Sequence, residues 1–132
     1  MDNNNLAVER IALISKEFTE GFEFLKNYPK SVSIFGSTKA EESDLYYTRA
    51  HTLAARIVRE IKYSIITGGS SGIMEAANRG AYEAGGNSIG LLIDLPDGQA
   101  TNKYLTASVG FHHFFVRKVC LSFSAEAYIF YP

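Results

Sequence analysis

Short runs rich in β-branched and apolar residues alternate with helix-like stretches along most of this sequence, and this alternation constrains the fold more than any other feature. Such runs occur at residues 31–36, 63–67, 87–93 and 127–131. Strands separated by helices usually join as right-handed βαβ units into one parallel sheet. The sequence therefore predicts an α/β protein with a parallel sheet of about four strands.

The stretches between these runs carry helical periodicity. Residues 6–26 place apolar side chains three or four positions apart, at Ile11, Ile14, Phe18, Phe22 and Leu25. A second helix is predicted from an N-cap at Ser43 to Ile61. Residues 73–84 form a third, whose small residues would let it lie close against a sheet. A fourth helix is predicted over residues 111–124, and residues 94–110, which contain Pro96, Asp97 and Gly98, are expected to form an irregular loop.

The length and composition fit one small domain. The chain has 132 residues, and a hydrophobic fraction of 46% is enough to build a core. We therefore expect a single Rossmann-like three-layer domain over residues 1–132, with helices on both faces of the sheet. Within it, residues 1–27 would form an N-terminal helix and residues 31–132 the βαβ core.

Charge and cysteine content narrow the possible partners and compartment. Thirteen basic and fourteen acidic residues give a net charge of −1, without the basic excess that nucleic-acid binding usually needs. The single cysteine, Cys120, cannot form an internal disulfide and fits a reducing cytosol. The N-terminus lacks signal-peptide features, and no run approaches the ~18 apolar residues of a membrane span. A soluble, cytoplasmic protein without nucleic-acid or membrane partners is expected.

The segment from Gly68 to Glu75 carries the strongest indication of chemistry. Consecutive glycines after a strand allow a sharp turn that points several N–H groups at one spot, and the following helix adds its positive dipole end. The string is neither a Walker A motif nor the dinucleotide fingerprint GxGxxG. By spacing alone, it is either a phosphate cradle or a plain tight turn before a closely packed helix.

Two other segments leave alternatives open. Residues 36–38 (Gly-Ser-Thr) follow the first predicted strand at the same edge and either add hydroxyl and amide donors or form an ordinary loop. Arg117 and Lys118 lie within an otherwise apolar helix, where they either reach the surface or meet an anion.

No metal or nucleophile site is indicated. His112 and His113 are adjacent, so on a helix they diverge, and the sequence has no H-x-x-x-H spacing. Cys120 is expected to be a core thiol. No Ser-His-Asp or Cys-His set can be argued, and neither a metal nor another cofactor is expected.

Taken together, the loops resemble the LOG family of nucleoside 5′-monophosphate phosphoribohydrolases, many of which carry the label "possible lysine decarboxylase". The resemblance extends from about Tyr28 to the last residue. Its motifs occur here, in order, as TGGSSGIMEAANRGA (67–81), SIGL (88–91), LP (95–96) with Gln99 and Asn102, and FFVRK (114–118). It implies that the glycine-rich turn is a phosphate cradle.

The resemblance also assigns roles to residues. The residues around the nucleotide would be Gly36, Ser37, Gly68, Gly69, Ser70, Ser71, Gly72, Met74 and Glu75. Gln99 and Asn102 would lie on the loop over it, and Arg117 would be the active-site arginine, with Lys118 beside it. The implied reaction is hydrolysis of the N-glycosidic bond to free base and ribose 5-phosphate, in which a carboxylate stabilises the developing oxocarbenium ion.

Two departures from the family pattern matter. The usual GGGPG is GGSSG here, but Ser70 and Ser71 can still donate N–H groups, so anion binding should survive. The sequence stops at Pro132, where the family continues into PGGxGTxxE with the catalytic glutamate, so we expect this chain to bind but not to turn over. The lysine decarboxylase label gains no support, because no lysine has the context of a Schiff-base residue.

Three functional hypotheses follow from this resemblance. The chain is part of a nucleoside monophosphate hydrolase, a carrier or sensor of a nucleotide-like ligand in the manner of molybdenum cofactor carriers, or an inert fragment that self-associates. The expected partner is an AMP-like nucleoside 5′-monophosphate or phosphate. A homodimer or larger homo-oligomer is expected, since the run at 127–131 would leave an apolar strand edge unpaired.

Overall fold

The computed structural model describes residues 3–95, 98 and 100–132 of the chain. Nine elements occur in these ranges. The strands are β1 (Ser31–Phe35), β2 (Ser64–Thr67), β3 (Ser88–Ile93), β4 (Ala107–Phe111) and β5 (Ala127–Phe130). The helices are α1 (Asn3–Leu25), α2 (Leu45–Ile61), α3 (Ile73–Glu83) and α4 (Phe114–Ser122).

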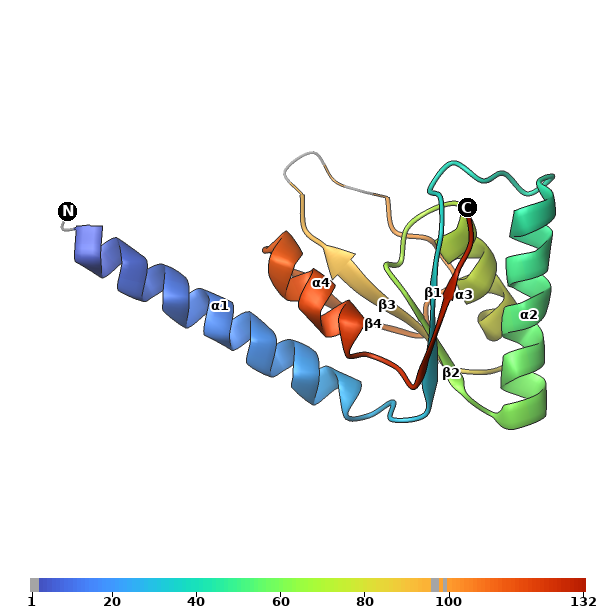
Figure 1. The fold of residues 1–132 in the computed structure, drawn as a ribbon, viewed down its shortest axis with the longest axis horizontal. Helices are drawn as coiled ribbons and strands as arrows, with labels where there is room; N and C mark the ends of the chain where they lie inside the picture. Colours follow the sequence, from blue (N-terminus) through green and yellow to red (C-terminus); the bar gives the residue numbers. More distant parts are fainter. Residues whose placement is uncertain (1–2, 96–97, 99) are drawn as a thin grey trace.

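The strands form one parallel sheet in the order β4-β3-β2-β1-β5. Helices α2 and α3 pack together on one face, and α1 and α4 on the other (Figure 1). Each face has its own apolar cluster. The predicted Rossmann-like three-layer α/β fold is therefore confirmed.

The strand β4 corrects the sequence prediction in two places. Residues 107–111, expected as the end of an irregular loop and the start of a helix, pair with β3 instead, and α4 begins only at Phe114. The sheet thus has five strands rather than about four. The sequence ASVGF lacks a β-branched run, but β4 is an edge strand that buries mainly Phe111. Pairing with β3 and this one burial decide its conformation more than local propensity does.

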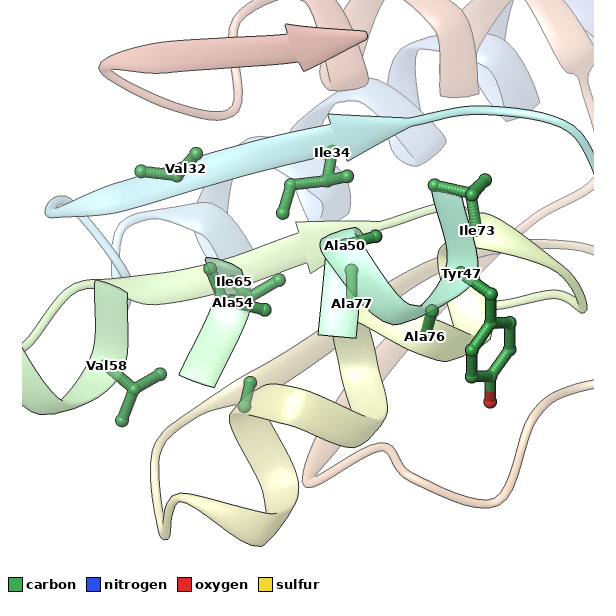
Figure 2. Packing of buried hydrophobic residues seen from close by; sticks show 11 residues of the cluster. Val32, Ile34, Tyr47, Ala50, Ala54, Val58, Ile65, Ile73, Ala76 and Ala77 are labelled. Atoms are coloured by element: carbon green, nitrogen blue, oxygen red, sulfur yellow. The ribbon is translucent and has the colours of Figure 1, made fainter. Parts of the chain in front are cut away.

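The core on the α2–α3 face is built from small side chains on the helices and larger ones on the strands. Figure 2 shows Val32, Ile34 and Ile65 of β1 and β2 lying against alanines of α2 and α3. The alanines at 76, 77 and 81 have no exposed surface. A Cβ at Gly80 would lie 2.2 Å from the backbone oxygen of His51, so glycine there lets α3 pack directly on α2. The small side chains within residues 73–84 thus allow close packing of this helix, as the sequence predicts.

The helix α1 is anchored on the opposite face by its C-terminal half, while its N-terminal half extends away from the domain (Figure 1). Gly21 lies so close to α4 and β4 that a Cβ there would come within 2.8 Å of the Cys120 sulfur. The buried Glu17 carboxylate accepts hydrogen bonds from the backbone N–H of His112 (2.6 Å) and of His113 (3.3 Å), and it also bonds the His113 ring. A carboxylate of α1 therefore satisfies donors at the N-terminus of α4.

These contacts change the acidity of Glu17. Burial alone would raise the pKa of its carboxyl, but the hydrogen bonds from His113 and from the two backbone N–H groups outweigh burial and lower the pKa below its ordinary value. The charged carboxylate is thus the form that holds α1 on α4.

We expect Glu17→Gln to lower the free energy of unfolding by about 1–2 kcal/mol at neutral pH, because the amide removes the charge from the α4 N-terminus. Since folding lowers the pKa of Glu17, its contribution is fully present above the ordinary value of 4.5 and is lost as the pH falls through the lower folded value. Urea unfolding at a series of pH values measures this difference. Glu20→Gln is the control, because Glu20 is exposed and only pairs with Lys16 at 3.8 Å. Equal effects of the two variants would contradict the assignment.

Candidate functional site

The loops after β1 and β2 meet at the carboxyl edge of the sheet. The N–H of Ile73, the first residue of α3, donates to the carbonyl oxygen of Ser37 (3.0 Å), and the Ser71 hydroxyl donates to that of Thr38 (2.9 Å). A Cβ at Gly72 would lie 2.1 Å from the Ser37 oxygen, so only glycine permits this approach. The loop at 36–38 is thus part of the same structure as the glycine turn.

The glycine turn itself needs glycine for its backbone conformation. Gly69 and Gly72 have φ angles of 75° and 72°, which side chains other than glycine rarely adopt. A Cβ at Gly69 would also lie 2.2 Å from a methyl group of Leu92. The turn ends at Gly72, and α3 begins there, so its positive dipole end lies at this edge of the sheet.

A cavity of about 300 Å³ opens beside the turn. Its lining residues come from both faces of the sheet and are Phe35, Gly36, Thr38, Gly68, Ser70, Met74, Leu95, Phe114, Arg117 and Leu121. One side of the cavity is lined by aromatic and aliphatic side chains, and the other by the glycine turn and Arg117. Gly36, Gly68, Ser70, Met74 and Arg117 of the predicted site therefore share one cavity.

Arg117 is the cation of this cavity. Its guanidinium donates to the carbonyl oxygens of Leu91 (2.7 Å) and Gly68 (3.1 Å), so this partly buried side chain turns toward the sheet edge instead of extending into solvent. Burial lowers the pKa of this guanidinium, which remains charged at any physiological pH. In the described ranges, no ion pair joins Arg117 to an Asp or Glu. A partly buried cation held only by carbonyl dipoles favours an anion beside it.

Asn102 lies under the glycine turn. Its side-chain amide donates to the carbonyl oxygen of Ser70 (2.9 Å) and to the side chain of Asn78 (3.0 Å), and its side-chain oxygen accepts the N–H of Tyr104 (3.0 Å). Both amide hydrogens are used within the protein. The structure thus brings Asn102 to the site, where it holds the turn; contact with a ligand stays a prediction.

Sequence reasoning missed Thr67 and Asn78, which complete this buried network. The Thr67 hydroxyl accepts the N–H of Gly69 (2.9 Å) and donates to Asn78, and neither side chain has exposed surface. The signal in the sequence that could have indicated this network is Asn78, a polar residue on the face of α3 that otherwise carries small apolar residues.

Glu75 and Lys118, two other residues of the predicted site, do not line this cavity. Glu75, in the first turn of α3, is partly buried and accepts a hydrogen bond from the Tyr47 hydroxyl (3.0 Å). Burial and the neighbouring Glu75 carboxylate raise the pKa of Tyr47 to about 12, against the opposing effect of Arg79. Lys118 is exposed and lines an adjacent apolar hollow of about 490 Å³ instead. Gln99 lies outside the described residues.

The histidines and the cysteine have other partners. His113 bonds Glu17, and the His112 Nδ1 lies 3.5 Å from the Asp94 Oδ2, so the two rings have different partners. Both residues precede the first residue of α4 instead of lying on a helix as predicted. Cys120 is a fully buried core thiol, and burial together with the nearby Glu17 carboxylate raises its pKa to about 11. Among the described residues, no three His, Cys, Asp or Glu side chains gather as metal ligands would. No helix in that part of the chain is both long and apolar enough to span a bilayer.

The family follows from a comparison with protein-family models. Residues 29–130 match the SLOG cluster4 family, a LOG-related family. The chain belongs to this family. The match begins after α1, so the helix that carries Glu17 lies outside the matched region. A search of curated protein sequences gave no significant match.

Solved structures share the fold. The X-ray structure of TM1055, a structural genomics target, is 26% identical, with a TM-score of 0.63 over 76% of this chain and 59% of that one. The molybdenum cofactor carrier protein from Chlamydomonas reinhardtii is 22% identical (TM-score 0.64, 77% of this chain and 62% of that one). The molybdenum cofactor binding protein from the phototrophic bacterium Rippkaea orientalis is 18% identical (TM-score 0.63, 77% and 61%). This chain thus spans about three fifths of the length of these neighbours.

Proposed function

We propose that this domain binds the phosphate of a nucleoside 5′-monophosphate in the cavity between the glycine turn and α4. The observation that supports this most is the environment of Arg117. It is a partly buried cation on the cavity wall, and within the described residues its guanidinium is paired only with backbone carbonyls. A phosphate would supply the missing negative charge.

The rest of the cavity fits the same ligand. The turn at residues 68–72 leads into the N-terminus of α3, and a glycine-rich turn at a helix N-terminus favours phosphate. Phe35, Leu95 and Phe114 supply an apolar wall of the kind that a flat base can pack against. Ser37, Ser71 and Gly72 lie in the adjoining loops and would contribute hydroxyl and amide donors.

We expect Gly69→Val to abolish measurable AMP binding, because a side chain at φ 75° distorts the turn and its Cβ would lie 2.2 Å from Leu92. Gly85→Val is the matched control. Gly85 also has a positive φ, of 79°, but a Cβ there meets nothing within 4 Å. Both variants therefore carry a similar backbone strain of about 1–2 kcal/mol, and only one of them touches the turn. Titration calorimetry with AMP measures the binding. Unchanged affinity in Gly69→Val, or equal losses in both variants, would contradict a phosphate site at the turn.

The proposed reaction is hydrolysis of the bond between base and ribose 5-phosphate, as in LOG phosphoribohydrolases. Cleavage builds positive charge on the sugar, so a carboxylate must stabilise it and direct a water molecule. Arg117 would hold the phosphate or the leaving base. Glu75 is the nearest carboxylate of the predicted site, but it accepts a hydrogen bond from Tyr47 at the dipole end of α3, which favours a stabilising role over a reactive one. We therefore propose that the residues of this chain bind the nucleotide and that turnover needs the PGGxGTxxE segment of the family.

We expect the 132-residue chain to bind AMP and to release no adenine above background, since a missing general acid–base or electrostatic group typically costs about 10²–10⁴-fold in rate. A form extended through a PGGxGTxxE segment should release adenine, and Arg117→Ala in that form should lose most activity while staying folded. Chromatographic detection of free adenine measures both. Turnover by the 132-residue chain would contradict the division of roles and would make Glu75 the residue to replace next.

A carrier function is the second candidate, because two neighbours in the fold are a molybdenum cofactor carrier protein and a molybdenum cofactor binding protein. The same cavity would then hold the phosphate of a nucleotide-like ligand without cleaving it. Ligand binding without base release in the extended form would favour the carrier, whereas release favours the hydrolase.

We also propose that the chain forms a homodimer or larger homo-oligomer. The strand β5 lies at the edge of the sheet and presents Phe130, which is 74% exposed. The helix α1 adds exposed apolar residues at Val8, Ile11 and Leu13. An unpaired strand edge and uncovered apolar faces favour association. Light scattering coupled to size-exclusion chromatography should show a mass above 14.6 kDa, and a monomer at high concentration would contradict this proposal.

A further inference from the structure

We infer that Thr67 and Asn78 are positioning residues, which orient the glycine turn and Arg117 for phosphate recognition. This inference rests on the proposed function, since it names the groups that give that site its geometry. Neither residue lines the cavity, and both are fully buried.

The side chain of Asn78 is fixed by partners on three sides. Its carbonyl oxygen accepts from the Thr67 hydroxyl (2.5 Å) and from the Asn102 amide (3.0 Å). Its amide group donates to the Ser88 hydroxyl (2.9 Å) and to the carbonyl oxygen of Ile89 (3.4 Å). A buried amide with its donors and acceptor occupied has one orientation, because any rotation would leave buried polar atoms unpaired.

The Thr67 hydroxyl transmits this orientation to the first peptide plane of the turn. The hydroxyl has one hydrogen, which goes to Asn78, so it accepts the N–H of Gly69 (2.9 Å) with a lone pair. In a trans peptide, the N–H of Gly69 and the carbonyl of Gly68 point in opposite directions. Turning that N–H into the protein therefore turns the Gly68 carbonyl outward, and this carbonyl accepts from the Arg117 guanidinium (3.1 Å).

Asn102 fixes a second peptide plane in the same way. Its amide, held by Asn78, binds the carbonyl oxygen of Ser70 (2.9 Å), so the N–H of Ser71 points away from the buried network. A carbonyl facing a phosphate would repel it, whereas an N–H attracts it. The network thus keeps the Ser70 carbonyl away from an anion and leaves the Ser71 N–H outside the network, while the outward Gly68 carbonyl is occupied by Arg117.

The experiment compares loss of the Thr67 hydroxyl under the turn with loss of a buried hydroxyl elsewhere in the sheet, using AMP titration calorimetry and thermal unfolding. Thr67→Val keeps the shape of the side chain but removes the acceptor of the Gly69 N–H. We expect it to weaken AMP binding by about tenfold or more, whereas Thr67→Ser, which keeps the hydroxyl, should stay within about twofold of the unaltered chain. Ser33→Ala removes a buried hydroxyl of β1 that bonds the Ser124 hydroxyl (2.6 Å) and is not part of the Asn78 network. It should lower the melting temperature and leave AMP affinity unchanged.

Each outcome decides the inference. Unchanged affinity in Thr67→Val would overturn it, as would an equal loss in Ser33→Ala, because the loss of affinity would then follow from lowered stability alone. If Thr67→Val does not fold, Asn102→Ala is the second variant to measure. Both amide hydrogens of Asn102 bond within the protein, so the expected loss of AMP affinity reports on the turn and not on a lost ligand contact. Normal AMP affinity in Asn102→Ala would overturn the inference. Absence of AMP binding by the unaltered chain would instead contradict the proposed function, on which the inference rests.

Discussion

Helix α3 lies very close to the sheet, and the glycine turn and the buried network beneath it both require this close packing. Alanines at 76 and 77 have no exposed surface, and a Cβ at Gly36 would lie 2.6 Å from the side chain of Ile73. Because nothing bulky separates the layers, the first residue of α3 bonds directly to the loop after β1, and Asn78 reaches both β2 and β3. A larger residue on this face would separate the helix from the sheet and break the network under the turn.

The opposite layer supplies the cation. Arg117 comes from α4, on the far face from α3, and reaches the carbonyl oxygens of β3 and of the glycine turn. The position of α4 in turn depends on α1, whose Glu17 satisfies donors at the α4 N-terminus. The candidate site is therefore assembled from both layers at the carboxyl edge of a parallel sheet, where α/β proteins commonly bind ligands.

Family membership and local geometry support different parts of the functional argument. The match over residues 29–130 establishes a LOG-related domain, and the neighbours establish that one fold occurs in proteins described as carrying or binding molybdenum cofactor. The choice between hydrolysis and carriage is a question about the site, because one fold supports many functions. Within the described residues, the groups that bear on it are Arg117, Glu75 and the turn that Thr67 and Asn78 hold.

The order of the elements, the parallel sheet and the glycine turn could be predicted from the residues alone, because they follow from local periodicity and from the backbone freedom of glycine. The motif resemblance further singled out Arg117. Residues 107–111, in contrast, become a strand through packing in the folded chain, since an edge strand of weak propensity takes its conformation from its neighbour β3. The folded chain also turns Arg117 toward the glycine turn and places the amide of Asn102 beneath that turn. Those outcomes depend on hydrogen bonds between residues 26 to 49 positions apart, which no local pattern encodes.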